Sequence, residues 1–348
     1  MHISNREIND KEKPYIIAEL SGNHAGVYSN AKKIIDAAKW AGVDAIKLQT
    51  FKPELMTIDS NKKKFMVNHE NSKWSDKSLF SLFSKAHTPW NWYPRLKSYC
   101  KKKNITLFSS VFDLKSLKFL ESLNFPAYKI ASFENDDLNL IQEIAKRKKP
   151  VIMSTGMATL REINKSYSTI NKFINKESLA LLKCTSSYPA PLEYSNLKTI
   201  PDMKKRFKCQ VGLSDHTIGN ISSITAVSMG ASIIEKHICL NKKTGIDSFF
   251  SLTPKHFKKL VDELNYCWKS KGKIFYGASK SEKKSLKNKR SLFASKNIKI
   301  NEKLTWKNII SLRPVIGIKS QFFNQVINKT SKLPIKKNEP ISLKMIKK

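Results

Sequence analysis

The chain is poor in paired cysteines and in long apolar runs, and each shortage excludes a class of protein. Its 348 residues hold five widely spaced cysteines with no CxxC pair: Cys100, Cys184, Cys209, Cys239 and Cys267. This spacing excludes a zinc ribbon and a disulfide framework. No 18-residue apolar run and no signal peptide is found, so we expect a cytoplasmic protein without a membrane segment.

Acidic residues and arginine are also scarce. There are 28 Asp and Glu against 64 Lys and Arg, which gives a formal net charge of +36 and a pI near 9.9. Such a charge ordinarily suggests nucleic acid as a partner. Only seven of the basic residues are arginine, however, and no RRM, KH, zinc-finger or helix-turn-helix pattern occurs. Because base and phosphate recognition depend heavily on arginine, we disfavour nucleic-acid binding and expect a general attraction for anionic metabolites.

Apolar runs typical of strands alternate with segments of helical spacing over about 270 residues. The predicted strands are 15–20, 44–49, 105–110, 128–132, 151–156, 179–184, 211–213 and 231–235, and the clearest helices are 31–41, 94–102, 221–229 and 254–269. Eight such units favour a (β/α)8 TIM barrel, with a doubly wound open sheet as the alternative. We expect the barrel over 1–271, a linker over 272–289 and a small, mostly β domain over 290–348.

Val211–Leu240 reads as one strand–helix–strand step of a parallel sheet, with a histidine at the close of each strand. Neighbouring parallel strands end at the same mouth, so His216 and His237 are expected to meet there. Two imidazoles suit a divalent transition metal such as Mn, Fe, Co or Zn. The alternative is two unrelated histidines, one in a loop and one in the core.

Polar side chains mark the carboxyl ends of several other predicted strands. Lys47 and Lys129 interrupt apolar strands, which is costly unless each lysine meets an anion. With neighbouring serine hydroxyls they would bind a small phosphorylated anion, although either lysine could instead pair with a glutamate inside the barrel. Glu19 and Glu134 could exchange protons. The spacing predicts a metal-assisted lyase or transferase acting on an organophosphate.

One further stretch and one arginine each have two interpretations. Residues 52–78 form a long polar stretch without a clear period, expected to be a substrate-covering loop or a surface excursion. Arg313 is the one arginine of the carboxyl-terminal region outside the linker edge, and an ordinary surface cation is an equally good interpretation.

Seven motifs together resemble the sialic-acid synthase family, and the carboxyl-terminal part resembles its antifreeze-like (SAF) domain. The motifs are AELSGNH (18–24), KLQTF (47–51), YKIASFE (128–134), STGMAT (154–159), CTSSYPAP (184–191), GLSDHTIG (212–219) and IEKH (234–237). The resemblance implies condensation of phosphoenolpyruvate with an acylated amino sugar, releasing phosphate and forming a nine-carbon 2-keto sugar acid. It also implies a divalent metal, commonly Mn²⁺, with Mg²⁺ or Co²⁺ as alternatives.

The same resemblance assigns roles to individual residues. His216 and His237 would be the metal ligands, and Glu19 and Glu134 would handle protons near the reacting centre. Phosphoenolpyruvate would contact Lys47, Ser110, Lys129, Ser132, Ser154 and Ser214, while Gln49, Tyr188 and Asp247 would face the sugar. In the implied mechanism, C3 of phosphoenolpyruvate attacks the sugar aldehyde, water adds at C2, and phosphate leaves while the lysines stabilise charge. Arg313 would reach the sugar's acyl group from the partner of a domain-swapped homodimer.

Within the family, Phe133, the SSYPAP wording and the stretch Thr88–Trp92 resemble the pseudaminic acid branch. The acceptor would then be 2,4-diacetamido-2,4,6-trideoxy-L-altrose, with the neuraminate and legionaminate precursors as alternatives. Three positions depart from the family pattern: Val111 replaces a frequent proline, Gly245-Ile246-Asp247 replaces Gly-Pro-Asp, and Phe249-Phe250 is bulkier than usual.

Overall fold

The computed structural model describes residues 1–67, 74–75 and 77–347. The chain divides into two compact units, Met1–Gly272 and Lys273–Lys348. The first unit holds the closed sheet and its helices, and the second holds a small separate core. Within the described ranges, no helix is both long and apolar enough to cross a bilayer.

Eight parallel strands close into a barrel in chain order, with the last strand, β10, paired to the first, β3. The closure confirms the predicted TIM barrel and excludes the open sheet. The strands are β3 (Tyr15–Glu19), β4 (Ala45–Thr50), β5 (Thr106–Val111), β6 (Tyr128–Ile130), β7 (Val151–Ser154), β8 (Leu179–Cys184), β9 (Gln210–Asp215) and β10 (Ile233–His237).

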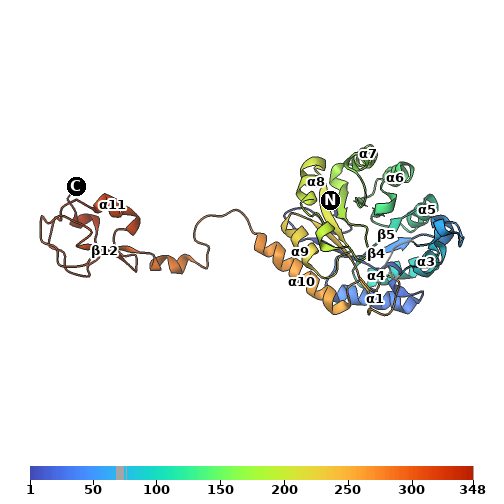
Figure 1. The fold of residues 1–348 in the computed structure, drawn as a ribbon, viewed down its shortest axis with the longest axis horizontal. Coiled ribbons are helices and arrows are strands. Elements are labelled where there is room, and N and C mark those ends of the chain that lie inside the picture. The colour runs from blue at the N-terminus through green and yellow to red at the C-terminus, as the bar shows by residue number, and fades with distance from the viewer. Residues whose placement is uncertain (68–73, 76, 348) are drawn as a thin grey trace. The chain divides into compact units, whose positions relative to one another are not determined.

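Helices surround these strands (Figure 1). They are α1 (Tyr28–Ala41), α2 (Pro53–Met56), α3 (Leu79–Ala86), α4 (Tyr93–Lys102), α5 (Leu114–Ser122), α6 (Leu138–Lys146), α7 (Leu160–Asn171), α8 (Thr199–Phe207), α9 (Ile221–Ser228) and α10 (Pro254–Lys271). In α1 the predicted apolar face is buried, and the helix ends at Gly42, whose φ of 88° suits glycine. A short antiparallel hairpin, β1 (His2–Ile3) with β2 (Arg6–Glu7), precedes the barrel.

Every barrel strand except β8 differs from its predicted bounds by one or two residues, and the differences at β10, β9 and β6 bear on the site. β10 starts at Ile233, because the N–H of Ala231 still donates to the carbonyl of Ala226 and closes α9. β9 continues through Asp215, beyond the predicted end at Leu213. β6 stops at Ile130, since residues 132–134 turn into a short 3-10 helix, η4 (Ser132–Glu134). This turn brings Ser132 and Glu134 to the barrel mouth.

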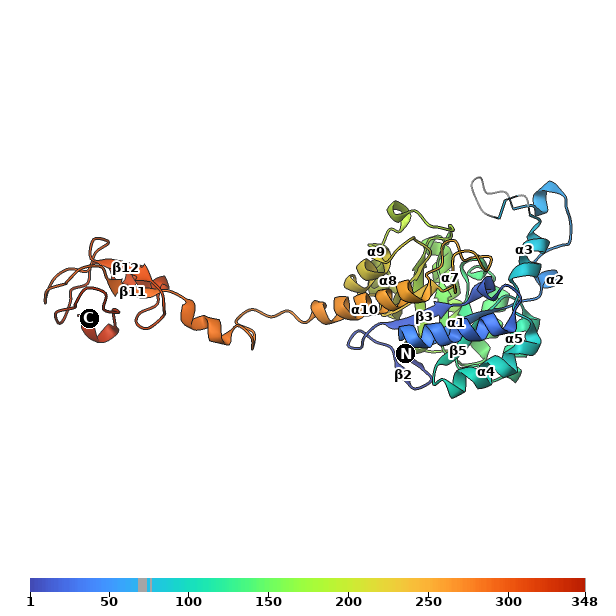
Figure 2. The same ribbon diagram turned by 90° about the horizontal axis from the view of Figure 1, so that it is seen from below.

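The segment after β4 stands out from the rest of the barrel unit (Figure 2). It contains α2, the short 3-10 helix η2 (Lys63–Phe65) and α3. The predicted covering loop, 52–78, falls partly outside the described residues, at 68–73 and 76. Its described part contributes side chains to the cavity discussed below, so it is more than a surface excursion.

The second unit has its own small apolar core, which includes Leu292, Ile298, Leu304 and Ile335. Two strands pair in antiparallel fashion, β11 (Ser291–Ala294) with β12 (Ile309–Leu312). The other elements are η7 (Lys283–Asn288), η8 (Ser320–Phe322), α11 (Phe323–Val326) and η9 (Leu343–Met345). Part of the expected linker is therefore a 3-10 helix. Within the domain that was expected to be mostly β, Val326 ends α11 and packs into the core from that helix.

Candidate active site

A cavity of about 530 Å³ lies where the barrel strands end. It is lined by twelve of the residues singled out from the sequence: Lys47, Gln49, Ser110, Lys129, Ser132, Glu134, Ser154, Tyr188, Ser214, His216, His237 and Asp247. Side chains alternate along a strand, so residues two apart reach the same mouth. Glu19 does not line the cavity; it is fully buried and contacts the cavity-lining Lys47.

Lys47 lies among buried acidic and hydroxyl groups. Its ammonium pairs with Glu19, lies 3.5 Å from Glu235 Oε1 and donates to Ser110 Oγ at 3.0 Å. The alternative that a lysine pairs with a glutamate inside the barrel is thus realised at Lys47. Burial would lower the pKa of Lys47, but Glu19 and Glu235 raise it above its usual value. Lys47 therefore remains a cation.

Lys129 differs from Lys47 because its direct contacts are uncharged. Its ammonium donates to Ser154 Oγ at 2.6 Å and to the carbonyl of Ile130 at 3.1 Å. Burial lowers the pKa of Lys129, and the charge of Glu235 opposes that effect. A buried cation without a directly bonded carboxylate gains free energy from an incoming anion. Lys129 is accordingly the stronger of the two lysines as an anion-binding group.

Gly156 lets two hydroxyls converge beside Lys129. Its N–H donates to Ser132 Oγ at 3.2 Å. A Cβ placed at this position would stand 2.3 Å from Ser186 Oγ and 2.6 Å from Ser132 Oγ. The φ of Gly156 lies outside the left-handed region, so the close approach of these hydroxyls is what requires glycine here.

His216 and His237 meet at the mouth, with ring centroids 5.4 Å apart and planes inclined by 68°. His216 Nδ1 is 3.0 Å from the carbonyl of Thr185. A proton on Nδ1 would donate to that carbonyl and leave Nε2 as a ligand atom. His237 Nδ1 is buried without a hydrogen-bond partner and lies 3.7 Å from Asp247 Oδ2. Burial and the nearby His216 lower the pKa of His237 well below its usual value, which favours the neutral form that binds metals.

This donor set fits a divalent cation that keeps positions for water or substrate. Among the described residues, no three His, Cys, Asp or Glu side chains form a ready-made metal site. Two imidazoles, one with a buried ring nitrogen that has no partner, would supply the protein ligands. The expectation that the histidines are unrelated is not met.

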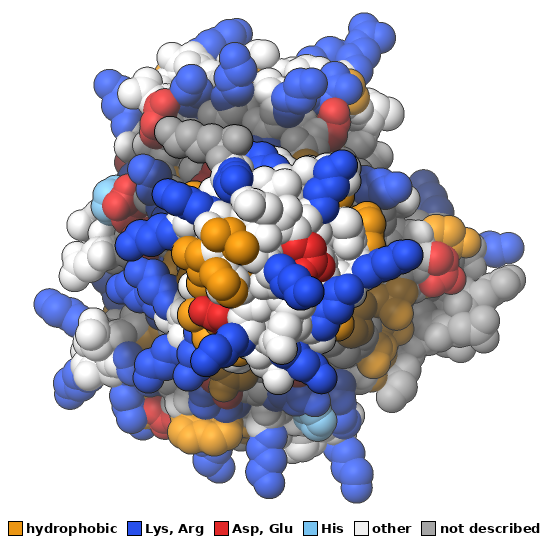
Figure 3. All heavy atoms as spheres, turned by 90° about the vertical axis from the view of Figure 1, so that its left-hand side faces the viewer, with side chains coloured by type: hydrophobic (Ala, Val, Ile, Leu, Met, Phe, Trp, Pro, Cys, Tyr) orange, Lys and Arg blue, Asp and Glu red, His pale blue; other side chains and the backbone are white. Residues whose placement is uncertain are grey.

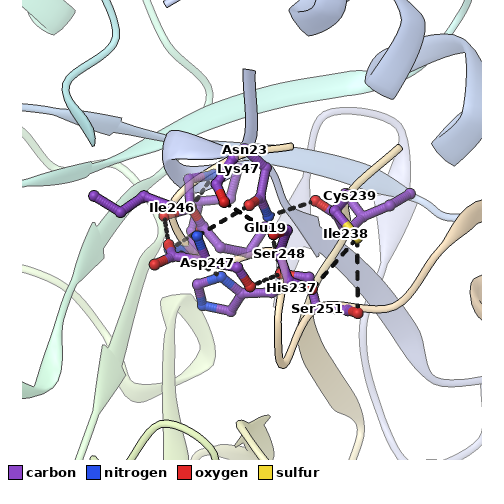
Figure 4. Close-up of polar contacts among 12 residues, drawn as sticks. Glu19, Asn23, Lys47, His237, Ile238, Cys239, Ile246, Asp247, Ser248 and Ser251 are labelled. Carbon is purple, nitrogen blue, oxygen red and sulfur yellow. Dashed lines mark hydrogen bonds and ion pairs between the residues drawn. The ribbon is translucent and has the colours of Figure 1, made fainter. Parts of the chain in front are cut away.

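The loop after β10 brings Asp247 to His237 (Figure 4). Asn23 fixes this loop: its amide donates to the carbonyl of Ile238 at 2.8 Å and to Ser251 Oγ at 2.9 Å. The side-chain oxygen of Asn23, Oδ1, accepts from the backbone N–H of Asp247 at 3.2 Å. The Asp247 carboxylate also accepts from Ser21, which follows β3. The loop is thus held to the first strand of the barrel despite the departure from the family pattern.

Two carboxyl groups, Glu134 and Glu19, neighbour the strand lysines and are suited to proton exchange. Burial raises the pKa of Glu134 to about 7, and the charge of Lys129 works against the rise. One Glu134 oxygen, Oε2, is buried without a hydrogen-bond partner. Burial also raises the pKa of Glu19 to about 7, opposed by Lys47. Both groups can therefore change protonation near neutral pH.

Aromatic rings cover the histidine pair. Tyr188 lies 4.4 Å from the His216 ring, and Phe250 lies 4.8 Å from the His237 ring, both measured between centroids. Trp74 contacts Tyr188 at 5.5 Å, and its indole N–H donates to the carbonyl of Ile246 at 3.1 Å. The bulky Phe250 that departs from the family pattern therefore forms part of this cover.

One side of the cavity is apolar, which the sequence did not indicate. The apolar wall, as we name it, consists of Phe51, Met56, Val67, Leu79, Leu82, Phe83, Ala86, Phe112 and Ile246. Most of these residues belong to the segment between β4 and α4, which carries α2 and α3. Four of them, Leu79, Leu82, Phe83 and Ala86, have the spacing of one helix face, a sign in the sequence to which no element was assigned. The cavity combines this apolar wall with a cationic, hydroxyl-rich floor. By the floor we mean Lys47, Lys129, Ser110, Ser132, Ser154 and Ser214.

Glu235 is the other group that sequence reasoning missed. It lines the cavity, accepts from Ser214 Oγ at 3.2 Å and neighbours Lys47. Burial would raise the pKa of Glu235, but Lys129 and Lys47 lower it. A signal was present, because Glu235 precedes His237 by two residues on the same face of a strand.

Arg313 belongs to the second unit. There it lines a basic groove with Lys289, Arg290 and Lys319. The guanidinium of Arg290 donates to the carbonyl of Ser311 at 3.0 Å.

Comparison with known proteins decides the family. Residues 34–276 match the NeuB family, and residues 289–347 match the SAF domain. The chain belongs to the NeuB family. It is a synthase that condenses phosphoenolpyruvate and forms a nonulosonic acid, and the resemblance read from the motifs is confirmed. Synthases of the NeuB family generally use a divalent metal, which the histidine pair fits.

Two relatives of known name align with nearly the whole of this chain. The pseudaminic acid synthase of Campylobacter jejuni (strain NCTC 11168) is 41% identical over 97% of both chains. The N,N'-diacetyllegionaminic acid synthase of the same strain is 36% identical over 95% of this chain and 99% of the relative. The crystal structure of an N-acetylneuraminic acid synthetase from Leptospira borgpetersenii, in complex with citrate, is 31% identical with a TM-score of 0.72, covering 82% of this chain and 94% of the other.

Proposed function

We propose that the barrel condenses phosphoenolpyruvate with 2,4-diacetamido-2,4,6-trideoxy-L-altrose to give pseudaminate and phosphate. The observation that carries the proposal is the division of the cavity into a cationic floor and an apolar wall. A trianionic phosphate ester suits the floor, and a sugar with two acetyl methyls and a 6-methyl group suits the wall. The 41% identity to a pseudaminic acid synthase, against 36% to the legionaminic enzyme, supports this choice of sugar.

The floor provides the phosphoenolpyruvate subsite in this proposal. Lys129 has no directly bonded carboxylate, while Lys47 must exchange part of its contact with Glu19 and Glu235 for the incoming anion. The hydroxyls of Ser110, Ser132, Ser154 and Ser214 lie beside these cations and would donate to phosphate and carboxylate oxygens. The lysines then stabilise the negative charge that passes to phosphate as it leaves.

His216 and His237 would hold the divalent metal, with Mn²⁺ as the proposed ion and Mg²⁺ or Co²⁺ as alternatives. When bound there, the metal would act as a Lewis acid on the sugar's aldehyde oxygen. Tyr188 and Phe250 exclude water from the side of the rings that they cover. Asp247 would orient a sugar hydroxyl beside His237.

Glu134 would be the base for water addition at C2. It neighbours Lys129, so it lies toward the phosphoenolpyruvate end of the cavity. As C3 forms the new bond to the aldehyde carbon, C2 becomes cationic, and Glu134 takes a proton from the water that adds there. The tetrahedral carbon then loses phosphate. The oxygen of the former aldehyde becomes an alkoxide and needs a proton, which Lys47 would give and Glu19 would replace through its buried contact with Lys47.

Gln49, Tyr188 and Asp247 would contact the sugar's polar groups, and the apolar wall would contact its methyl groups. N-acetylmannosamine offers one acetyl methyl and an additional hydroxyl at C6, which the wall cannot hydrogen-bond. An unpaired buried hydroxyl costs about 1–3 kcal/mol, enough for roughly 10–100-fold discrimination. The apolar wall does not discriminate between the two diacetylated acceptor sugars, the precursors of pseudaminate and legionaminate.

The deciding experiment offers phosphoenolpyruvate and Mn²⁺ with each acceptor in turn and identifies the product by mass and NMR. We expect kcat/KM for the diacetamido-trideoxy altrose to exceed that for N-acetylmannosamine by at least about tenfold. Preference for N-acetylmannosamine or for the legionaminate precursor would overturn the choice of sugar. The NeuB-family activity would still stand.

We also propose that Arg313 reaches the acyl group of the sugar from the partner of a domain-swapped homodimer. The proposal rests on the family resemblance and on a lysine-rich connection after α10. A guanidinium that donates to an amide carbonyl contributes about 1.5–3 kcal/mol of binding.

A further inference from the structure

A buried ion pair lies directly behind the two histidines. Asp215 precedes His216 at the end of β9, Lys236 precedes His237 on β10, and the sheet register places Asp215 opposite Lys236. Side chains alternate along a strand, so the histidines line the cavity while Asp215 and Lys236 do not. Lys236 Nζ is 2.7 Å from Asp215 Oδ2, and the two side chains are 2% and 1% exposed.

The pair belongs to a hydrogen-bond network that encloses the backbone around His216. Lys236 Nζ also donates to the carbonyl of Thr217 at 2.8 Å. Asp215 Oδ1 accepts from the N–H of Thr217 at 2.9 Å and from its hydroxyl at 2.8 Å. Asp215 Oδ2 accepts from Ser223 Oγ in α9 at 2.6 Å. The residues on both sides of His216 are thereby tied to β10 and to α9.

Net stability does not account for such a pair. Two buried charges lose hydration free energy that their mutual attraction roughly offsets, and apolar residues of similar volume often serve stability equally well. What the pair does provide is a single arrangement, because every donor that reaches Asp215 fixes a direction. If Lys236 were removed, the Asp215 carboxylate would be left buried and under-bonded, and the turn that carries His216 would have to shift.

We propose that the Asp215–Lys236 ion pair is a positioning device for the metal-binding histidines. It locks the ends of β9 and β10 together, so that the two imidazoles stand at the separation a divalent cation requires. The inference rests on His216 and His237 being the ligands, as proposed above. Residues that orient metal ligands typically change metal affinity by about 10–100-fold when they are altered.

The test measures Mn²⁺ affinity of the full-length, metal-stripped protein, with free Mn²⁺ followed by electron paramagnetic resonance. Lys236→Met removes the cation, and Asp215→Asn removes the charge while keeping the side-chain shape. Ser223→Ala removes the hydroxyl that donates to Asp215 Oδ2, the same oxygen that Lys236 contacts, so it loosens the pair without removing either charge. His237→Ala serves as the reference for loss of a ligand.

Thr50→Val is the matched control. Thr50 is buried in another polar network of the barrel, with Tyr93 OH at 2.8 Å and Ser109 Oγ at 2.6 Å, and it contacts neither histidine. Thermal unfolding of every variant shows how much stability each one loses. A purely structural role for the ion pair predicts equal Mn²⁺ affinity at equal loss of stability.

We expect Lys236→Met and Asp215→Asn to bind Mn²⁺ at least about tenfold more weakly, with an altered bound-Mn²⁺ spectrum, while Thr50→Val stays within about twofold. If the two charge variants fail to fold, weaker binding by Ser223→Ala alone supports the inference and unchanged binding overturns it. Unchanged affinity in a folded Lys236→Met or Asp215→Asn chain also overturns it. Full Mn²⁺ affinity in His237→Ala would overturn the metal site itself, a result separable from the others.

Discussion

At the scale of single residues, the two strand lysines carry unequal shares of anion binding. Lys47 is already paired with Glu19 and close to Glu235, whereas Lys129 contacts only a hydroxyl and a carbonyl oxygen. An anion that binds Lys129 displaces no carboxylate. This difference makes Lys129 the sharper probe of the phosphoenolpyruvate subsite.

We expect Lys129→Met to raise KM for phosphoenolpyruvate by roughly 10–100-fold, which corresponds to loss of one hydrogen bond to a charged group. Steady-state kinetics at saturating sugar measure the change. Lys183→Met is the matched control, since Lys183 is also a strand lysine of the barrel but does not line the cavity. Equal effects from both variants would contradict the assignment.

Glu134 makes the pH profile a second residue-scale test. Its pKa is raised to about 7 by burial, so the carboxylate needed to accept a proton forms only above that pH. We expect kcat to fall as the pH drops through about 7. Glu134→Gln should lower kcat by about 10²–10⁴-fold and abolish this acid limb.

The control for the pH profile is Glu193→Gln, an exposed carboxylate after β8. It should leave both kcat and the limb near pH 7 unchanged. Should Glu134→Gln keep the acid limb, another group would have to be the base. A wild-type kcat that rises toward low pH would likewise exclude Glu134 in this role.

At the scale of elements, α3 is the helix that contributes four residues to the apolar wall. Leu79, Leu82, Phe83 and Ala86 from this helix line the cavity. Helical residues three and four apart share one face, which is why these four positions act together. The helix begins with Ser78, whose hydroxyl accepts from the N–H of Ser81 at 3.2 Å.

We therefore expect Leu82→Gln to raise KM for the deoxy sugar about tenfold, while KM for phosphoenolpyruvate changes less than about twofold. The mechanism is loss of apolar contact with the sugar's methyl groups. Lys85→Gln, an exposed position of the same helix, is the control. An equal rise in both KM values would show that α3 shapes the cavity as a whole and does not select the sugar.

At the scale of the whole molecule, the positive charge is divided between surface side chains and buried lysines. Lysine and arginine side chains are scattered over the face shown in Figure 3 and are interrupted by acidic and apolar groups. The lysines that matter for chemistry are buried in the barrel. The NeuB-family activity accounts for an anion-binding floor without invoking a second partner.

The whole-molecule prediction concerns Arg313. We expect His237→Ala chains, inactive alone, and Arg313→Ala chains, weakened roughly 10–100-fold at sugar concentrations below KM, to regain about a quarter of wild-type activity when co-expressed. Half of the dimers are then mixed, and each mixed dimer has one complete site. Phosphate release measures the recovery. Activity no higher than that of the parents would show that Arg313 serves its own barrel or that no such dimer forms.

The sequence by itself determined the barrel and twelve of the residues that line its cavity. Apolar runs with period two, alternating with helical segments, are local patterns, so they can be read without knowing any contact. The order of the strands in a parallel barrel then follows from the chain, which is why His216 and His237 could be expected to meet across 21 positions. The ends of β6 and β10 cannot be read from such local patterns, because hydrogen bonds in the folded chain decide where each strand starts and stops.

Only the tertiary structure decided how the charges are paired and which surfaces the cavity presents. The contacts of Lys47 with Glu19 and Glu235, the pairing of Asp215 with Lys236 and the apolar wall all join residues that are distant in sequence or without periodic pattern. Charge pairing depends on separations of a few ångströms and on burial, and neither quantity is encoded in residue spacing. For that reason the residue types at the site could be predicted, but not the division of labour between its two lysines.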